Sequence, residues 1–69
     1  MERVFNVVRD KWSGGWRLEC RVTQEARVFT TRIEAVNRGS ERCRQARPSR
    51  LIVHSLDGRV QEQRLYARV

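Results

Sequence analysis

Residues 31–47, TRIEAVNRGSERCRQAR, decide the fold, because this is the one stretch of the chain with a helical pattern. Thr31 and Glu34 stand three residues apart, which is the arrangement of a capping box at a helix start. Pro48 ends the pattern, since proline cannot continue a helix. The other apolar stretches are short and rich in β-branched residues, as strands are. We therefore expect a sheet with a single helix laid across one face.

Small and apolar residues recur along the expected helix, Thr31 to Arg47, at spacings of three and four, which predicts the face that packs on the sheet. This stripe consists of Ile33, Val36, Gly39, Ser40, Cys43 and Ala46. A glycine inside a helix costs about 1 kcal/mol relative to alanine, so Gly39 needs a reason. Two explanations stay open: a bulky sheet residue such as Trp16 lies too close for a side chain, or the glycine is merely tolerated.

Runs of alternating or β-branched residues, separated by turn residues, predict the strands. Their expected ranges are Arg3 to Arg9, Trp16 to Val22, Ala26 to Thr30, Leu51 to His54 and Val60 to Tyr66. In the second of these, apolar residues alternate with charged ones, which predicts one buried face made of Trp16, Leu18, Cys20 and Val22. The last strand is mostly polar, as suits a sheet edge protected by its charges. The sequence thus predicts an α+β fold of order β-β-β-α-β-β, with an antiparallel-rich sheet, in one domain over residues 1–69.

Composition limits the classes of function. The chain has 69 residues and a formal net charge of +7, and all but Lys11 of its 15 basic residues are arginines. No apolar run approaches the roughly 20 residues of a membrane span. The start, MERVFNVVRD, lacks the apolar core of a signal peptide. We therefore expect a cytoplasmic protein with no role in the membrane and with reduced thiols.

Short motifs along nearly the whole chain point to a family. They are Val7-Val8 followed by Gly14-Gly15-Trp16, Phe29-Thr30-Thr31 ahead of Glu34-Ala35, Arg38-Gly39, Leu51 to His54, and DGRVQE at residues 57–62. In these motifs the chain resembles the small bacterial domains catalogued as domain of unknown function 2188, although Trp12 and Pro48 depart from them. The resemblance implies a compact strand-helix-strand fold and carries no assigned activity. The stretch that ends at Glu34-Ala35 is also similar to the amino-terminal DNA-binding domains of some phage-type integrases.

Candidate catalytic residues are few. His54 is the single histidine and could act as a general base, but no nucleophile can be placed beside it, so a structural role is expected. Cys20 and Cys43 stand at apolar positions without the spacing of metal ligands, and we expect buried, metal-free thiols. We accordingly expect no enzyme activity, no catalytic residue, no cofactor, no metal and no small-molecule substrate.

The basic residues form two competing surfaces. One is the helix exterior and its exit, and the other is the exposed face of the sheet; a hairpin tip with a possible stacking platform adds to them. The candidate nucleic-acid-binding residues are Arg38, Arg42, Arg44 and Arg47 on the helix, Arg17 and Arg21 on the sheet, and Lys11 and Trp12 at the tip. Arginine suits phosphate, and the leading hypothesis is nucleic-acid binding through an arginine-rich surface. The alternative is a protein-interaction or dimerising module without a nucleic-acid role, such as an accessory or inhibitor protein of a phage or mobile element, whose last strand extends a sheet between two chains.

Overall fold

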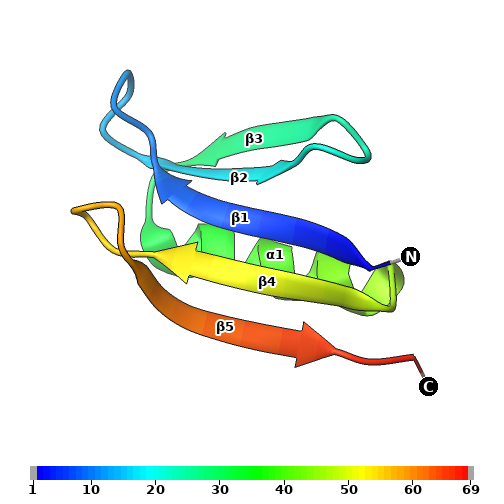
Figure 1. Ribbon diagram of the computed structural model, residues 1–69. Coiled ribbons are helices and arrows are strands. Elements are labelled where there is room, and N and C mark those ends of the chain that lie inside the picture. Colours follow the sequence, from blue (N-terminus) through cyan, green and yellow to red (C-terminus); the bar gives the residue numbers. More distant parts are fainter. Residues whose placement is uncertain (1, 69) are drawn as a thin grey trace.

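The computed structural model, described here for residues 2–68, is one sheet with a helix across one face (Figure 1). Its elements are β1 (Arg3–Arg9), β2 (Trp16–Cys20), β3 (Glu25–Phe29), α1 (Arg32–Gln45), β4 (Ser49–His54) and β5 (Val60–Tyr66). The five strands lie in the order β3-β2-β1-β4-β5. β1 and β4 run parallel, and all other neighbours are antiparallel. The predicted α+β class and element order are confirmed.

The helix starts where its sequence signature places it. Thr31 is the N-cap, and its hydroxyl accepts a hydrogen bond from the Glu34 backbone N–H at 3.2 Å. The Glu34 carboxylate accepts in return from the Thr31 N–H, also at 3.2 Å, which completes the capping box. At the other end Ala46 is the C-cap, so the helix is shorter than the predicted Thr31 to Arg47 by one residue at the start and two at the end.

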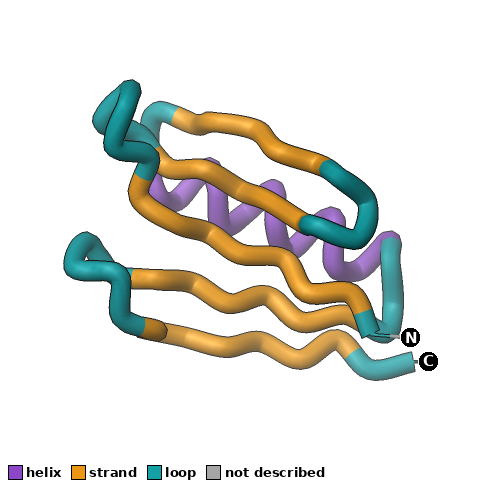
Figure 2. The backbone as a smooth tube through the Cα atoms, turned by 45° about the horizontal axis from the view of Figure 1, so that its top comes forward, coloured by secondary structure: helices purple, strands orange, loops and turns teal. Residues whose placement is uncertain are grey.

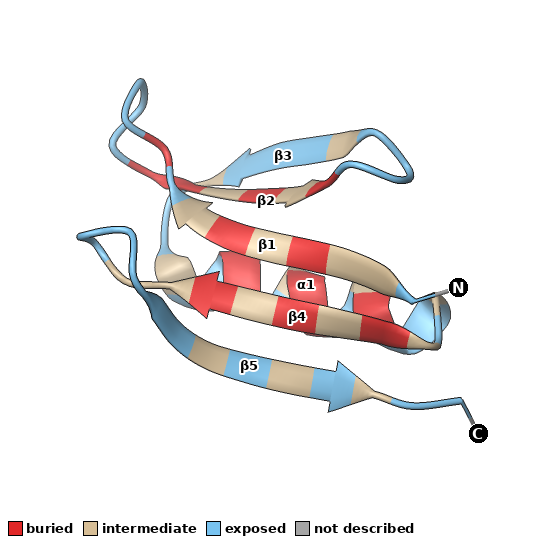
Figure 3. Cartoon of the chain, viewed as in Figure 1, coloured by how far each residue is buried: buried red, intermediate tan, exposed pale blue. Residues whose placement is uncertain are grey.

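The core lies between the helix and the covered face of the sheet (Figure 3). Its buried apolar members are Phe5, Val7, Trp16, Leu18, Cys20, Ala35, Val36, Cys43, Leu51 and Val53. A Cβ built on Gly39 would stand 2.8 Å from a Leu51 methyl carbon and 3.1 Å from one of Leu18. Gly39 therefore lets the helix approach the sheet closely, which is the first of the two explanations given above. The sheet residues that face it are Leu18 and Leu51 rather than Trp16.

Two side chains predicted to be buried are exposed. Ile33 is 70% exposed, and Ala35 takes a place in the core instead. At 3.6 residues per turn, Ile33 falls at the flank of the face centred on Gly39 and Cys43. Val22 is 61% exposed, because β2 ends at Cys20 and the next residues form a turn.

Strand boundaries otherwise shift by one or two residues. β3 covers Glu25–Phe29 rather than Ala26 to Thr30, and β4 begins at Ser49 rather than Leu51. The Ser49 hydroxyl donates to the Cys43 carbonyl at 2.7 Å, so the first residue of β4 is tied to the last turn of the helix. β1 and β5 have the predicted bounds.

The turns gather at two ends of the sheet, and this arrangement positions the charged residues. The β2–β3 turn, the C-terminal end of α1, the start of β1 and the end of β5 lie at one end (Figure 1). The β1–β2 and β4–β5 turns and the start of α1 lie at the other end. α1 covers a single face of the sheet, and no element covers the opposite face within residues 2–68 (Figure 2).

Candidate nucleic-acid interface

Ion pairs divide the basic residues into two groups. Six of the 15 have a carboxylate oxygen within 4.0 Å, namely Arg17, Arg38, Arg42, Arg50, Arg59 and Arg64. The other nine have no such partner among the described residues: Arg3, Arg9, Lys11, Arg21, Arg27, Arg32, Arg44, Arg47 and Arg68. The net positive charge of the chain therefore resides on this second group.

The acidic residues are almost fully occupied by the first group. Seven of the eight take part in these ion pairs: Glu2, Asp10, Glu19, Glu25, Glu41, Asp57 and Glu62. The eighth, Glu34, closes the helix cap. The charge of the nine unpaired bases is thus offset by no ion pair within residues 2–68.

Five of the nine unpaired bases lie at the same end of the molecule. We call this the basic end and define it as Arg3, Arg21, Arg44, Arg47 and Arg68. They come from the start of β1, the β2–β3 turn, the last turn and exit of α1, and the residues after β5, which meet at that end (Figure 1). The remaining four are Arg27 on the β3 edge and Arg9, Lys11 and Arg32 at or near the opposite end.

Arg47 is held in place by neutral groups. Its Nη1 donates to the Ala67 carbonyl at 3.1 Å. The centre of its guanidinium lies 5.7 Å from the centroid of the Tyr66 ring, within the range of a cation–π contact. These contacts orient the side chain without neutralising it, so its charge stays available to an anion.

The structure separates the residues predicted to bind nucleic acid. It brings Arg21, Arg44 and Arg47 to the basic end, and it leaves Lys11 and Trp12 at the opposite end. Trp12 is 95% exposed and does not fold down onto apolar surface.

The three other predicted residues are engaged by carboxylates. Arg38 lies 2.7 Å from Glu41. Arg17 lies 3.1 Å from Asp10 and 3.0 Å from Glu19. Arg42 pairs with Glu25 of β3.

The pairing of Arg42 with Glu25 is the strongest of these contacts. Arg42 donates from Nε to one carboxylate oxygen at 2.8 Å and from Nη2 to the other. This two-pronged hydrogen bond lowers the pKa of Glu25 to about 2 and raises the pKa of Arg42. Because both groups stay charged at neutral pH and are already paired, Arg42 has little attraction left for a phosphate.

Sequence reasoning did not include Arg3 and Arg68 in the site. Nothing in their local sequence marks them, since one begins the first strand and the other follows the last. They reach the helix exit only because β4 lies between β1 and β5 in the sheet. The order of strands, which periodicity does not reveal, is what makes them part of the basic end.

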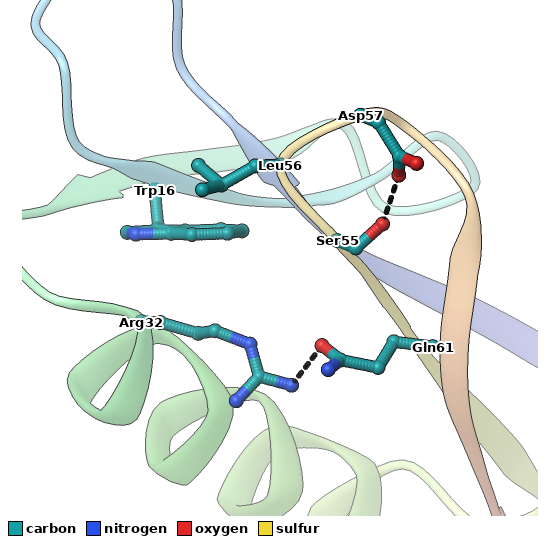
Figure 4. A pocket seen from close by; sticks show the side chains of 6 residues that line it. All are labelled: Trp16, Arg32, Ser55, Leu56, Asp57 and Gln61. Carbon is teal, nitrogen blue, oxygen red and sulfur yellow. Dashed lines mark hydrogen bonds between the residues drawn. The ribbon is translucent and has the colours of Figure 1, made fainter.

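A second feature is an open depression of about 520 Å³ near the start of the helix (Figure 4). It is lined by Trp16, Arg32, Ser55, Leu56, Asp57 and Gln61. Arg32 runs below the Trp16 ring and donates to the Gln61 side-chain oxygen at 2.7 Å. The one carboxylate of the depression, on Asp57, already accepts from Ser55 and from the Arg59 N–H. No histidine or cysteine is among the residues that line this depression.

The residues considered for catalysis lie elsewhere. His54 Nδ1 is 3.1 Å from the Val7 carbonyl, a contact between neighbouring strands that suits a structural histidine. Cys20 and Cys43 are buried, as predicted, and burial raises the pKa of the Cys43 thiol. Within residues 2–68 no three His, Cys, Asp or Glu side chains are grouped as metal ligands would be. None of the described helices has the length and apolar character needed to cross a membrane.

Comparison with known proteins places the chain in a family. No curated protein and no solved structure matches it. One family model matches residues 5–66, which is nearly the whole chain and confirms the resemblance seen in the short motifs. The chain therefore belongs to the family described as "uncharacterized protein conserved in bacteria (DUF2188)".

Proposed function

We propose that this protein binds nucleic acid through its basic end, by contacts to phosphates that do not depend on base sequence. The single observation that supports the proposal is the distribution of charge. Nine bases have no carboxylate partner within the described chain, and five of them share one end. A polyanion that meets this surface gains counterion release without first breaking an internal ion pair.

The outer side of the helix is a poorer surface for phosphates. Glu34 and Glu41 both stand on it, and each would repel a phosphate close by. Arg38 would have to leave Glu41 before it could bind one. The end of the molecule is favoured over the helix side for this reason.

The chemistry of the basic end suits phosphate more than base recognition. The basic residues of this end are all arginines, and the planar guanidinium group of an arginine matches two phosphate oxygens at once. These arginines lie in turns and at the ends of helices and strands. In the described chain only the C-terminal end of α1 reaches the basic end, so this surface does not offer the side of a helix to a DNA groove. We therefore expect similar affinity for different sequences.

Two double variants test where binding occurs. Arg21→Gln with Arg44→Gln removes two charges from the basic end at exposed positions. Lys11→Gln with Arg9→Gln is the matched control, because it removes two exposed charges that also lack a carboxylate partner, from the opposite end. In titrations of a labelled duplex, the first variant should weaken binding to every sequence and reduce the salt slope by about 2, and the control should change both far less. Equal losses of affinity in the two variants would show that binding is not confined to the basic end.

A further inference from the structure

β5 forms one edge of the sheet, and no element of the described chain covers its outer side (Figure 1). The strand is seven residues long, Val60–Tyr66, and pairs with β4 along its inner side only. Its outer backbone N–H and C=O groups are consequently free to pair with another strand. An uncovered edge of this length needs either protection from pairing or a partner.

The sequence of β5 complements itself when it is read in both directions. If Gln63 faces Gln63 in an antiparallel pair, Glu62 faces Arg64 on both sides of the centre. The pairing of β5 with β4 shifts by one residue at Gln61, so the regular part of the strand begins at Glu62. We propose that a second copy of this chain pairs with β5 in this register. Each Glu62 then lies opposite the partner's Arg64, so the charged residues of the strand all meet an opposite charge.

Cross-strand contacts in this register are favourable. Facing side chains in an antiparallel pair have Cβ atoms about 4.5–5.5 Å apart, close enough for ion pairs. Leu65 is 65% exposed and would lose contact with water. Glu62 and Arg64 already form an ion pair at 2.7 Å within one chain, so the dimer would bring together four charges in which each neighbours the opposite sign.

The opposite edge, β3, lacks this complementarity. Its sequence is EARVF, and pairing it with itself in full antiparallel overlap places Arg27 opposite Arg27. Like charges directly opposite each other destabilise a sheet. Glu25, the one carboxylate of this strand, is already bound to Arg42. Charge therefore selects β5 over β3 as the edge that dimerises.

The register also fixes the shape of the dimer. Because a residue faces its own copy, the two-fold axis stands perpendicular to the sheet, and side chains of one face stay on one face. The two five-stranded sheets would become continuous, with both helices on the same side. The dimer does not depend on nucleic-acid binding, and either proposal can fail without the other.

Cysteine cross-linking tests the register. Gln63→Cys places two thiols across the two-fold axis, and mild oxidation should give a disulfide-linked dimer. Leu65→Cys is the matched control, since this exposed residue stands on the same side of the strand two residues from the axis and should stay unlinked. Cys20 and Cys43 are buried and do not compete. Equal linkage of both variants, or linkage of neither, would overturn the proposed register.

Exchanging the charges of Glu62 and Arg64 tests whether these two residues pair across the proposed dimer. By sedimentation or light scattering the parent should have twice the monomer mass of 8.2 kDa. Glu62→Arg puts arginine opposite arginine and should give a monomer, and adding Arg64→Glu should restore the dimer. Ser40, which accepts from Arg64 at 3.0 Å, can donate to a glutamate there, so the double variant keeps that contact.

Circular dichroism of each variant establishes that it is folded before its mass is compared. A monomeric parent, or a parent that joins only to extended peptides of other proteins, would overturn the proposal. So would a double variant that is folded and still monomeric.

Discussion

Two glycines of this protein allow close contacts, and they differ in what a side chain would meet. A Cβ on Gly15 would lie 2.3 Å from the Phe29 carbonyl oxygen, which is backbone of the neighbouring strand. A Cβ on Gly39 would meet the methyl end of Leu51 at 2.8 Å, and a leucine methyl can turn aside. Gly15→Ala should therefore cost about 2 kcal/mol or more of the free energy of unfolding. Gly39→Ala should be close to neutral, because alanine favours the helix by about 1 kcal/mol. Urea denaturation of the two variants measures the difference, and equal stabilities would contradict it.

A larger residue at Gly39 should have a clear cost. Gly39→Leu would push several additional carbon atoms against Leu18 and Leu51, which are both buried in the core. Overpacking of this kind costs about 1–3 kcal/mol. Asn37→Leu is the control, because it adds the same side chain to the same helix at an exposed position. Thermal melting should separate the two variants, and a Gly39→Leu protein as stable as the parent would show that the packed face of the helix is misplaced.

At the scale of elements, the Arg42–Glu25 pair joins the helix to the β3 edge, and it makes stability depend on pH. The pKa of Glu25 is about 2 in the folded protein and about 4.5 in the unfolded chain. Since the folded value is the lower one, the pair stabilises fully above pH 4.5 and loses its contribution as pH falls toward 2. Glu25 is 38% exposed, so solvent screening reduces the contribution to roughly 1 kcal/mol.

Glu25→Gln should remove that part of the acid dependence. Its free energy of unfolding should fall less than that of the parent between pH 4.5 and pH 2, as measured by denaturation at several pH values. Glu41→Gln is the control, because its partner Arg38 lies on the same helix and both side chains are exposed by more than a third. If the two variants lose stability in parallel with the parent, the pair does not join helix and strand as described.

Much of the fold at this scale could be predicted from the sequence. Caps, turn residues and periodicity identified each element, because these signals act over a few neighbouring residues. These signals did not predict burial at the flank of the helix face or beyond the end of a strand. Ile33 and Val22 lie at such positions, and both are apolar and yet exposed. Ion pairs such as Arg42–Glu25 join residues 17 apart, and no local pattern shows them. For that reason the sequence did not show that Arg42 is already neutralised.

At the scale of the whole molecule, the sequence shows a net charge of +7 but not where that charge gathers. The sheet order brings the first and last strands beside the helix exit, and there Arg3, Arg44, Arg47 and Arg68 join the arginine of the β2–β3 turn. Seven of the eight acidic residues form their ion pairs with arginines that do not belong to the basic end. The basic end is thus a product of topology, and the central claim is that phosphates bind there.

The most direct measurement is the affinity for labelled duplex and single-stranded oligonucleotides over a range of salt concentrations. If three to five arginines of the basic end contact phosphates, the logarithm of the duplex association constant should fall with that of salt with a slope of about −3 to −5. Duplexes of unrelated sequence should give the same slope. Binding no tighter than about 10⁻⁴ M at physiological salt, or an affinity that salt leaves unchanged, would contradict the account.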